Sequence, residues 1–321
     1  MAEDKLFILH QGALGDVILT FASIIALRKK FGRIHILCQG QIGKLAVKLG
    51  LADKTYPLEA ACFATLFSKG VDAKIKDLIS SFETIVVFSF SAELENTINQ
   101  MTDRPCLRIP PRPPAQDNIH VAEFLLQNLI ARGLIEAAGA NDLVSDWQRQ
   151  HIRKARRPSD TLKVIIHPGS GSMRKRWPLA RFLELADELE ERGWQPQFLC
   201  GPAESDLDAE IENQNRQVHR FSDLTDLVDW LKTANRYIGN DSGISHLTAF
   251  LGIASVIIFG PADPERWQPP GPRVQVVRPA LDCDPCLEIE PHNCARSECL
   301  TDATLESVLN AFGQLHQNAK H

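Results

Sequence analysis

The sequence predicts an α/β protein with two doubly wound parallel sheets, each covered by helices. Short apolar runs alternate with stretches of helical periodicity along the 321 residues, which is the pattern of strand-helix-strand units. A polar and basic stretch at 147–160 interrupts the alternation, and the pattern restarts at Leu162. We therefore expect two Rossmann-like domains, 1–155 and 156–321, with the last helix a candidate to pack back on the first domain.

Apolar runs and periodicity place the elements of the first domain. The apolar runs predict strands at Lys5–His10, Arg33–Cys38 and Thr84–Phe90. The periodic stretches predict helices at Val17–Phe31, Gln41–Leu49 and Val121–Arg132. The proline cluster at 109–114 cannot be helical, because proline lacks the amide hydrogen that a helix interior needs.

The second domain repeats the same alternation. Strands are expected at Leu162–His167, Gln197–Cys200, Arg236–Gly239 and Ser255–Phe259. Helices are expected at Leu179–Arg192, Leu224–Ala234 and Ile244–Leu251. Ligands of such sheets bind outside the carboxyl ends of the strands, so the loops that follow the strands are the candidate functional segments.

Composition excludes several classes of protein. Asp and Glu outnumber Lys and Arg by 40 to 35, and the basic runs at 28–30 and 153–157 are short, so we expect no nucleic-acid partner. The residues Met1–Asp4 are acidic where a signal peptide is basic. No apolar run approaches the roughly 20 residues of a membrane span. We therefore expect a cytoplasmic protein.

The most informative turn runs from Gly239 to His246, between a predicted strand and a predicted helix. A helix that begins there directs unpaired backbone N–H groups and the positive end of its dipole at a ligand, which favours a phosphate. The turn therefore predicts a binding site for a nucleotide diphosphate. The alternative is an ordinary helix capped by Asp241 or Ser242.

A second strand-turn-helix of similar design lies near the N-terminus. Gly12 and Gly15 let the backbone of this turn approach a ligand closely, and Asp16 stands at the mouth of the following helix. A carboxylate in this place can act as a base, or it can simply cap the helix. The chain contains neither GxGxxG nor a P-loop motif, so dinucleotide and P-loop chemistry are not supported.

Five loops together carry a family resemblance. They are GALGD at 12–16, HPGSGSMRKRWP at 167–178, CGPAE at 200–204, NDSGISHLTAFLG at 240–252 and FGPADPERW at 259–267. In these loops, and in their order and spacing over both domains, the chain resembles glycosyltransferase family 9, the bacterial heptosyltransferases of lipopolysaccharide core assembly. The resemblance implies the GT-B fold, in which two Rossmann-like domains face each other across a cleft.

The resemblance also implies roles for individual residues. Asp16 would be the base that takes a proton from the acceptor hydroxyl, Lys175 a cation near the donor diphosphate, and Glu204 a partner for the donor ribose. The remaining donor-binding residues would be Gly12, Gly15, Ser170, Asp241, Ser242, Gly243 and His246. The residues themselves leave alternatives open: Lys175 as a solvated charge, Glu204 as an acid favoured by a helix dipole, and His246 as a packing residue.

The implied reaction is an inverting, metal-independent transfer that needs no cofactor. The donor would be ADP-heptose, and the acceptor a lipid-linked saccharide of the lipopolysaccharide inner core, at the cytoplasmic face of the inner membrane. Two alternatives stay open: a transferase of the same family with another nucleotide sugar or acceptor, and a nucleotide-sugar-binding protein without turnover.

The acceptor side departs from the family. Known members hold the acidic inner core with basic residues of the first domain, whereas 60–69 has one lysine and 91–95 has two acids. The arginines Arg104, Arg108 and Arg112 could supply positive charge instead.

Four cysteines cluster near the C-terminus: Cys283, Cys286, Cys294 and Cys299. Their spacing allows a zinc site, disulfides or free thiols, and the resemblance assigns the loop no catalytic role. Asp282-Cys283-Asp284 matches the DxD metal motif of other glycosyltransferases. Because it lies in this loop and not after a nucleotide-binding strand, we expect no metal at it.

Overall fold

The computed structural model describes residues 4–67, 72–152, 161–201, 204–279, 285–287 and 298–315. The chain divides into two compact units, the first formed by Met1–Pro114 and Val121–Leu143, the second by Ala115–His120 and Val144–His321. Each unit holds one parallel sheet, as the sequence predicts. The expected boundary between 155 and 156 lies outside the described residues.

The first unit contains a five-stranded parallel sheet in the order β3-β2-β1-β4-β5. The strands are β1 (Lys5–His10), β2 (Arg33–Cys38), β3 (Lys54–Pro57), β4 (Thr84–Phe88) and β5 (Cys106–Ile109). The strand order reverses beside β1, so the crevice expected to bind ligands lies at the carboxyl ends of β1 and β4.

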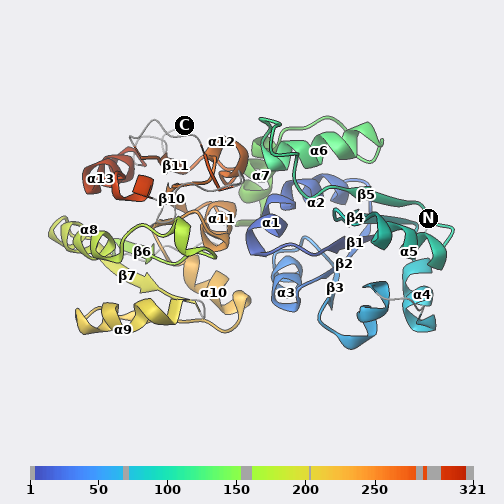
Figure 1. Ribbon diagram of the computed structural model, residues 1–321, viewed down its shortest axis with the longest axis horizontal. Coiled ribbons are helices and arrows are strands. Elements are labelled where there is room, and N and C mark those ends of the chain that lie inside the picture. Colours follow the sequence, from blue (N-terminus) through green and yellow to red (C-terminus); the bar gives the residue numbers. More distant parts are fainter. Residues whose placement is uncertain are drawn as a thin grey trace. The chain divides into compact units, whose positions relative to one another are not determined.

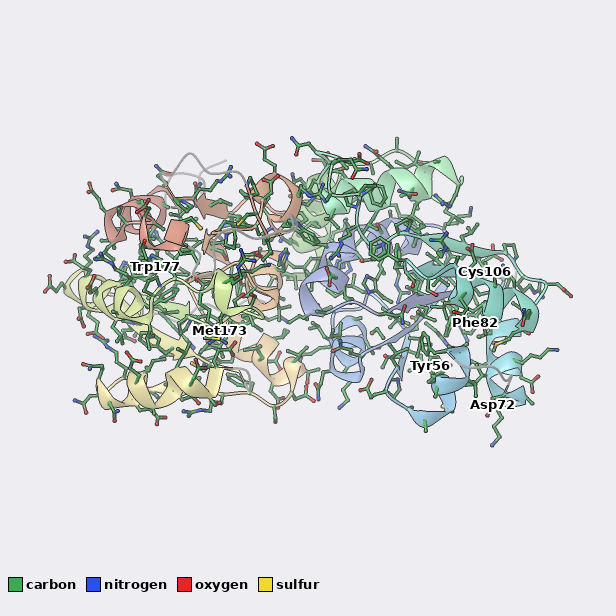
Figure 2. All side chains as sticks on the ribbon, viewed as in Figure 1. Tyr56, Asp72, Phe82, Cys106, Met173 and Trp177 are labelled. Carbon is green, nitrogen blue, oxygen red and sulfur yellow. The ribbon has the colours of Figure 1, made fainter. Side chains whose placement is uncertain are left out.

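Helices cover both faces of this sheet (Figure 1). They are α1 (Leu14–Leu19), α2 (Phe21–Arg28), α3 (Gly40–Lys48), the 3-10 helix η1 (Ala61–Phe67), α4 (Ala73–Ser80), α5 (Ala92–Met101), α6 (Val121–Ala131) and α7 (Ala140–Trp147), which continues into the second unit. Side chains from one face of the central strands form a core with α4, α5 and η1. Tyr56 and Phe82, marked in Figure 2, pack beside Phe7 with ring centroids 6.1 and 5.0 Å from its own.

The second unit contains a six-stranded parallel sheet in the order β11-β10-β9-β6-β7-β8. The strands are β6 (Lys163–His167), β7 (Gln195–Leu199), β8 (Val218–His219), β9 (Arg236–Asn240), β10 (Ala254–Ile258) and β11 (Val274–Val277). Counted within the unit, this is the same doubly wound order, and its reversal lies between β6 and β9.

Helices again cover both faces, with α8 and α13 on one and α10 and α11 on the other (Figure 1). The helical segments are η2 (Gln148–Ile152, a π-helix), η3 (Met173–Lys175), α8 (Leu179–Glu191), α9 (Ser205–Asn213), α10 (Leu224–Leu231), α11 (Gly243–Phe250), α12 (Pro264–Trp267), η5 (Glu298–Thr301) and α13 (Leu305–Gln314). The central strands β6, β9 and β10 are buried along their whole length, because both of their faces pack on helices.

The strands that the sequence predicts are the interior strands of the two sheets. The edge strands β3, β5, β8 and β11 were not predicted, and most of their residues are only partly buried. An edge strand meets solvent, so it lacks the continuous apolar run that marks an interior strand.

Two expectations need correction. The helix expected at Val17–Phe31 is two helices, α1 and α2, which meet at Thr20. The expected linker begins too early, because Trp147 packs against Phe250 with ring centroids 4.5 Å apart and Gln148 donates to the Ala249 and Phe250 carbonyls at the end of α11.

The last described helix, α13, packs within the second unit. Its apolar face contributes Val308, Ala311 and Phe312 to the core that α8 and the sheet share. Arg236 of β9 donates to the Phe312 carbonyl at 2.6 Å. The apolar stripe of α13 is therefore already buried by its own sheet.

Within the described ranges, no helix has the length and apolar character that crossing a bilayer requires.

Gly239 of β9 predicts a sharp packing limit. A Cβ atom there would lie 2.4 Å from the Tyr237 hydroxyl and 3.0 Å from the His167 carbonyl, so we expect Gly239→Ala to lower the free energy of unfolding by about 1–3 kcal/mol. The control is Gly313→Ala in α13, where a Cβ meets no atom within 4 Å and where alanine favours the helix. Urea unfolding measures both variants, and equal stabilities would contradict this packing.

Candidate functional site

The donor residues that the sequence predicts in the second domain lie at the carboxyl edge of the second sheet, whereas Gly12 and Gly15 follow β1 of the first. The loop after β6 carries Ser170 and Lys175, and the turn after β9 carries Asp241 and Ser242. These two strands are neighbours, with His167 opposite Gly239, so their loops start side by side. This is the place where the strand order reverses.

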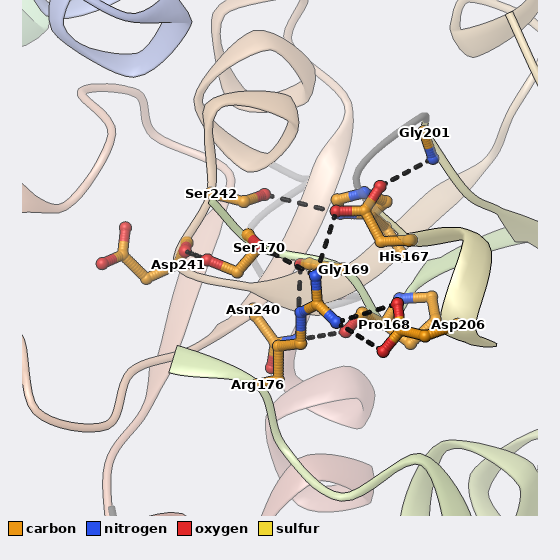
Figure 3. A network of polar contacts seen from close by, with 11 residues as sticks. His167, Pro168, Gly169, Ser170, Arg176, Gly201, Asp206, Asn240, Asp241 and Ser242 are labelled. Carbon is orange, nitrogen blue, oxygen red and sulfur yellow. Dashed lines mark hydrogen bonds and ion pairs between the residues drawn. The ribbon is translucent and has the colours of Figure 1, made fainter. Parts of the chain in front are cut away.

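Asn240, the last residue of β9, joins three segments of this edge. Its side chain is fully buried; Nδ2 donates to the Pro168 carbonyl at 2.8 Å and to the Gly169 carbonyl at 3.4 Å, and Oδ1 accepts from the Trp177 amide at 2.9 Å. The network converges on Asn240 and Arg176 (Figure 3). Asn240 was not a predicted site residue, although it lies within the Gly239–His246 turn that the sequence singles out.

The turn after β9 begins helix α11. Ser242 is its N-cap, because Ser242 Oγ accepts from the Ser245 amide at 3.3 Å. Of the two alternatives for the cap, Ser242 is therefore correct and Asp241 is not. Ser170 Oγ donates to the Asp241 carbonyl at 2.8 Å and ties the loop to the turn. Gly243 is the first residue of the helix.

The Asp241 side chain does not cap α11 and pairs with a lysine instead. Its carboxylate points away from the Arg176 side of the network (Figure 3) and lies 2.6 Å from Lys175 Nζ. Asp241 is 5% exposed and Lys175 23% exposed, so the lysine is paired and not simply solvated. The pair places one cation and one anion beside the N-terminus of α11.

His246 lies within the same helix, 4% exposed, with its Nε2 atom 3.9 Å from the Asp241 carboxylate. Burial lowers the pKa of His246 to about 4, so the ring is neutral at pH 7. Its Nδ1 atom is buried without a hydrogen-bond partner in the described residues.

Glu204 precedes α9 at the far side of the loop cluster. Its carboxylate accepts from the Gly201 amide at 2.7 Å and lies 3.9 Å from Arg176. Burial raises the pKa of Glu204 above its usual value. A Cβ atom at Gly169 would lie 2.4 Å from the Glu204 side chain, so glycine is needed at this approach.

Arg176 bridges these residues. It pairs with Asp206 at 3.1 Å and its guanidinium lies 3.5 Å from the Ser170 carbonyl. The sequence singles out the loop at 167–178 but indicates no role for Arg176. Its bridging role follows from the folded structure alone, because Glu204 and Asp206 are distant from it in the sequence.

Asp16 lies at the corresponding edge of the first sheet. It is the third residue of α1 and accepts from the Ala13 amide at 3.2 Å, while Ala13 is the N-cap. The alternative in which Asp16 is the N-cap is therefore wrong, because the helix starts at Leu14 instead of Val17. Gly15 lies within the first turn of α1.

Gly12 makes room for this carboxylate. A Cβ atom at Gly12 would lie 2.7 Å from the Asp16 Cβ and 2.6 Å from His10 Cε1. The Gly12 amide donates to His10 Nδ1 at 2.9 Å, so the ring proton is on Nε2, which faces Thr20 Oγ1 at 3.1 Å. Burial lowers the pKa of His10 to about 4 and keeps the ring neutral.

The cysteine cluster is only partly described. Cys283, Cys294 and the Asp282-Cys283-Asp284 motif lie outside the described residues. Cys286 and Cys299 are half-buried, and Arg174 lies 3.5 Å from the Cys286 sulfur. The choice between zinc, disulfides and free thiols therefore stays as the sequence left it.

A sequence profile described as glycosyltransferase family 9 (heptosyltransferase) matches residues 114–295, more than half of the chain. The match begins beyond Asp16 and includes the whole loop cluster of the second sheet. Among curated proteins, lipopolysaccharide heptosyltransferase 3 of Escherichia coli is 28% identical over 172 residues, which are 47% of this chain and 49% of that protein. The chain thus spans about half the length of the curated relatives it matches.

Two solved structures are similar over nearly the whole chain. The glycosyl transferase family 9 structure from Veillonella parvula has a TM-score of 0.74 at 18% identity and covers 99% of both chains. Heptosyltransferase WaaC of E. coli, solved with ADP, has a TM-score of 0.68 at 15% identity and covers 98% of this chain and 100% of that one. The expected GT-B fold is confirmed.

The buried histidines predict acid sensitivity. The pKa values of His10 and His246 fall to about 4, and that of His167, through burial and Arg176, to about 3, against 6.5 in an unfolded chain. Between the folded and the unfolded pKa of each histidine, the unfolded chain binds more protons than the folded protein. The contribution of these histidines to stability is therefore complete above pH 6.5 and falls as the pH is lowered. From pH 7.5 to pH 5 each histidine should cost on the order of 2 kcal/mol.

Urea unfolding at both pH values measures this loss. His246→Gln should reduce it by the share of one histidine. If His246→Gln loses as much stability as the parent between pH 7.5 and pH 5, His246 is protonated as easily in the folded protein as in the unfolded chain.

Proposed function

The chain belongs to glycosyltransferase family 9, and on this premise we propose that it transfers heptose from ADP-heptose to a lipopolysaccharide inner-core acceptor, with inversion and without a metal. The Lys175–Asp241 pair at the N-terminus of α11 is the observation that carries the proposal. A cation and the unpaired amides of a helix start are suited to a departing diphosphate.

The donor would bind to the second unit. Lys175 would turn from Asp241 toward the diphosphate, because a dianion attracts an ammonium more strongly than a single carboxylate does. Asp241, released in part, would accept from a donor hydroxyl. Ser170, Ser242, Gly243 and His246 would line the phosphate side, and Glu204 would accept from the ribose hydroxyls.

The acceptor chemistry would belong to Asp16 of the first unit. Its carboxylate takes the proton from the acceptor hydroxyl while the hydroxyl oxygen forms a bond to the anomeric carbon. The bond from that carbon to the diphosphate oxygen breaks, and ADP leaves with the electron pair. Gly12 and Gly15 would keep the turn open to the reacting sugars. No second carboxylate is needed, because a single displacement inverts the anomeric centre.

Support for the donor comes from the relatives. One solved neighbour is WaaC with ADP, and another is WaaC with ADP-2-deoxy-2-fluoro heptose. The curated relatives are lipopolysaccharide and lipooligosaccharide heptosyltransferases. We propose the same donor class here, with a lipid-linked acceptor reached by peripheral contact at the cytoplasmic face of the inner membrane.

ADP should stabilise the protein more than UDP or GDP. At a ligand concentration one hundred times the dissociation constant, the expected gain is about 2.7 kcal/mol. Thermal unfolding with each nucleotide measures it, and equal or absent shifts for the three would refute the donor assignment. Lys175→Gln should weaken the ADP shift, whereas Lys44→Gln on α3 of the first unit should leave it unchanged.

Asp16→Asn should lower the transfer rate by roughly a hundred- to ten-thousand-fold, because asparagine cannot accept the proton. The asparagine carbonyl can still accept from the Ala13 amide, so stability and ADP affinity should barely change. Transfer to heptose-free lipopolysaccharide and ADP affinity are measured on the same variant.

The matched control is Asp72→Asn, an aspartate that caps α4 in the same unit. It should transfer at the parent rate. If Asp16→Asn also transfers normally, the base lies elsewhere. If it instead loses ADP affinity, Asp16 shapes the donor site.

A further inference from the structure

One aromatic side chain at the carboxyl edge of the first sheet is conspicuously exposed. Phe90 lies two residues after the end of β4 and is 56% exposed. The Arg112 guanidinium lies 5.5 Å from the centroid of its ring. Arg112 follows β5, the neighbour of β4 in the sheet (Figure 1), so the two side chains come from adjacent strand ends.

The same edge carries the turn of Asp16. Ser89, the residue before Phe90, is 5% exposed and its hydroxyl donates to the Gln11 side chain at 2.8 Å. Gln11 directly follows β1 and precedes the Gly12 turn. The segment that holds Phe90 is therefore fastened to the segment that holds the proposed base.

The charges at this edge single out Arg112. Arg108 pairs with Glu95 at 2.9 Å, so its cation is already matched. Among the described residues, no carboxylate pairs with Arg112, which contacts the Phe90 ring. An exposed guanidinium over an exposed ring offers a planar donor fork and an apolar face together.

We propose that Phe90 and Arg112 form the acceptor subsite of this chain. The apolar face of an acceptor sugar ring packs on Phe90, and an anionic group of the same saccharide, a carboxylate or a phosphate, takes the guanidinium fork of Arg112. The inference rests on the proposed transferase function. It differs from the basic cluster that the family resemblance leads one to expect, because an aromatic face replaces most of the positive charge.

Steady-state kinetics with ADP-heptose and heptose-free lipopolysaccharide test the subsite. Phe90→Ala should raise the acceptor KM about tenfold, and Phe90→Tyr, which keeps the ring, should restore it. Arg112→Gln should raise the acceptor KM by a similar factor. In the parent the acceptor KM should increase with salt, and in this variant the increase should be absent, because glutamine has no charge to screen. The donor KM and the ADP affinity should stay at parent values in all three.

The control for truncating an exposed apolar side chain is Leu162→Ala in the second unit, 45% exposed, which should leave both KM values unchanged. If the parent transfers heptose, and both Phe90→Ala and Arg112→Gln keep the acceptor KM of the parent, the subsite is refuted and the proposed function stands. If the parent binds ADP but transfers nothing to this acceptor, the proposed acceptor falls, and the subsite with it.

Discussion

The buried side-chain amide of Asn240 is the interaction on which the candidate donor site depends. Its three hydrogen bonds hold the Pro168 and Gly169 carbonyls and the Trp177 amide at the end of β9. Those groups bracket the loop that carries Ser170 and Lys175. A buried carbonyl without a donor costs free energy, so the amide both satisfies the loop and gives it one conformation. The Lys175–Asp241 pair exists because the loop and the turn are held in this register.

The doubly wound strand order explains why polar residues collect where they do. In each sheet the order reverses beside the first strand, so the loops after two neighbouring strands diverge and leave their polar side chains accessible. The second sheet uses the place for a cation, an anion and a helix start. The first uses it for Asp16, which Gly12 admits by lacking a side chain. One architecture thus presents two different chemistries.

The proposed acceptor subsite differs from the basic cluster that the family resemblance leads one to expect. Glu95, one of the two acids after β4, pairs with Arg108. This ion pair neutralises one of the arginines that the sequence suggests for binding the acceptor. Phe90 and Arg112 remain as an exposed aromatic and cationic pair. Family membership alone would not have distinguished Arg108 from Arg112, since the two differ in their neighbours and not in their chemistry.

The fold class, the interior strands and most of the segments of the candidate site are predictable from the sequence. Interior strands such as β1 and β9 are buried on both faces, so they must be apolar throughout and are recognisable. The edge strands β3 and β8 were missed, because a strand half exposed to water carries no such requirement.

Tertiary structure alone decided which side chains meet. Lys175 pairs with Asp241 because β6 and β9 are adjacent and in register, although the two residues lie far apart in the chain. Asp16 is the third residue of its helix, and not the cap, because the helix starts at Leu14. Local periodicity records which residues can be buried. The partner of a polar group is set by the packing of distant segments, which no local pattern encodes.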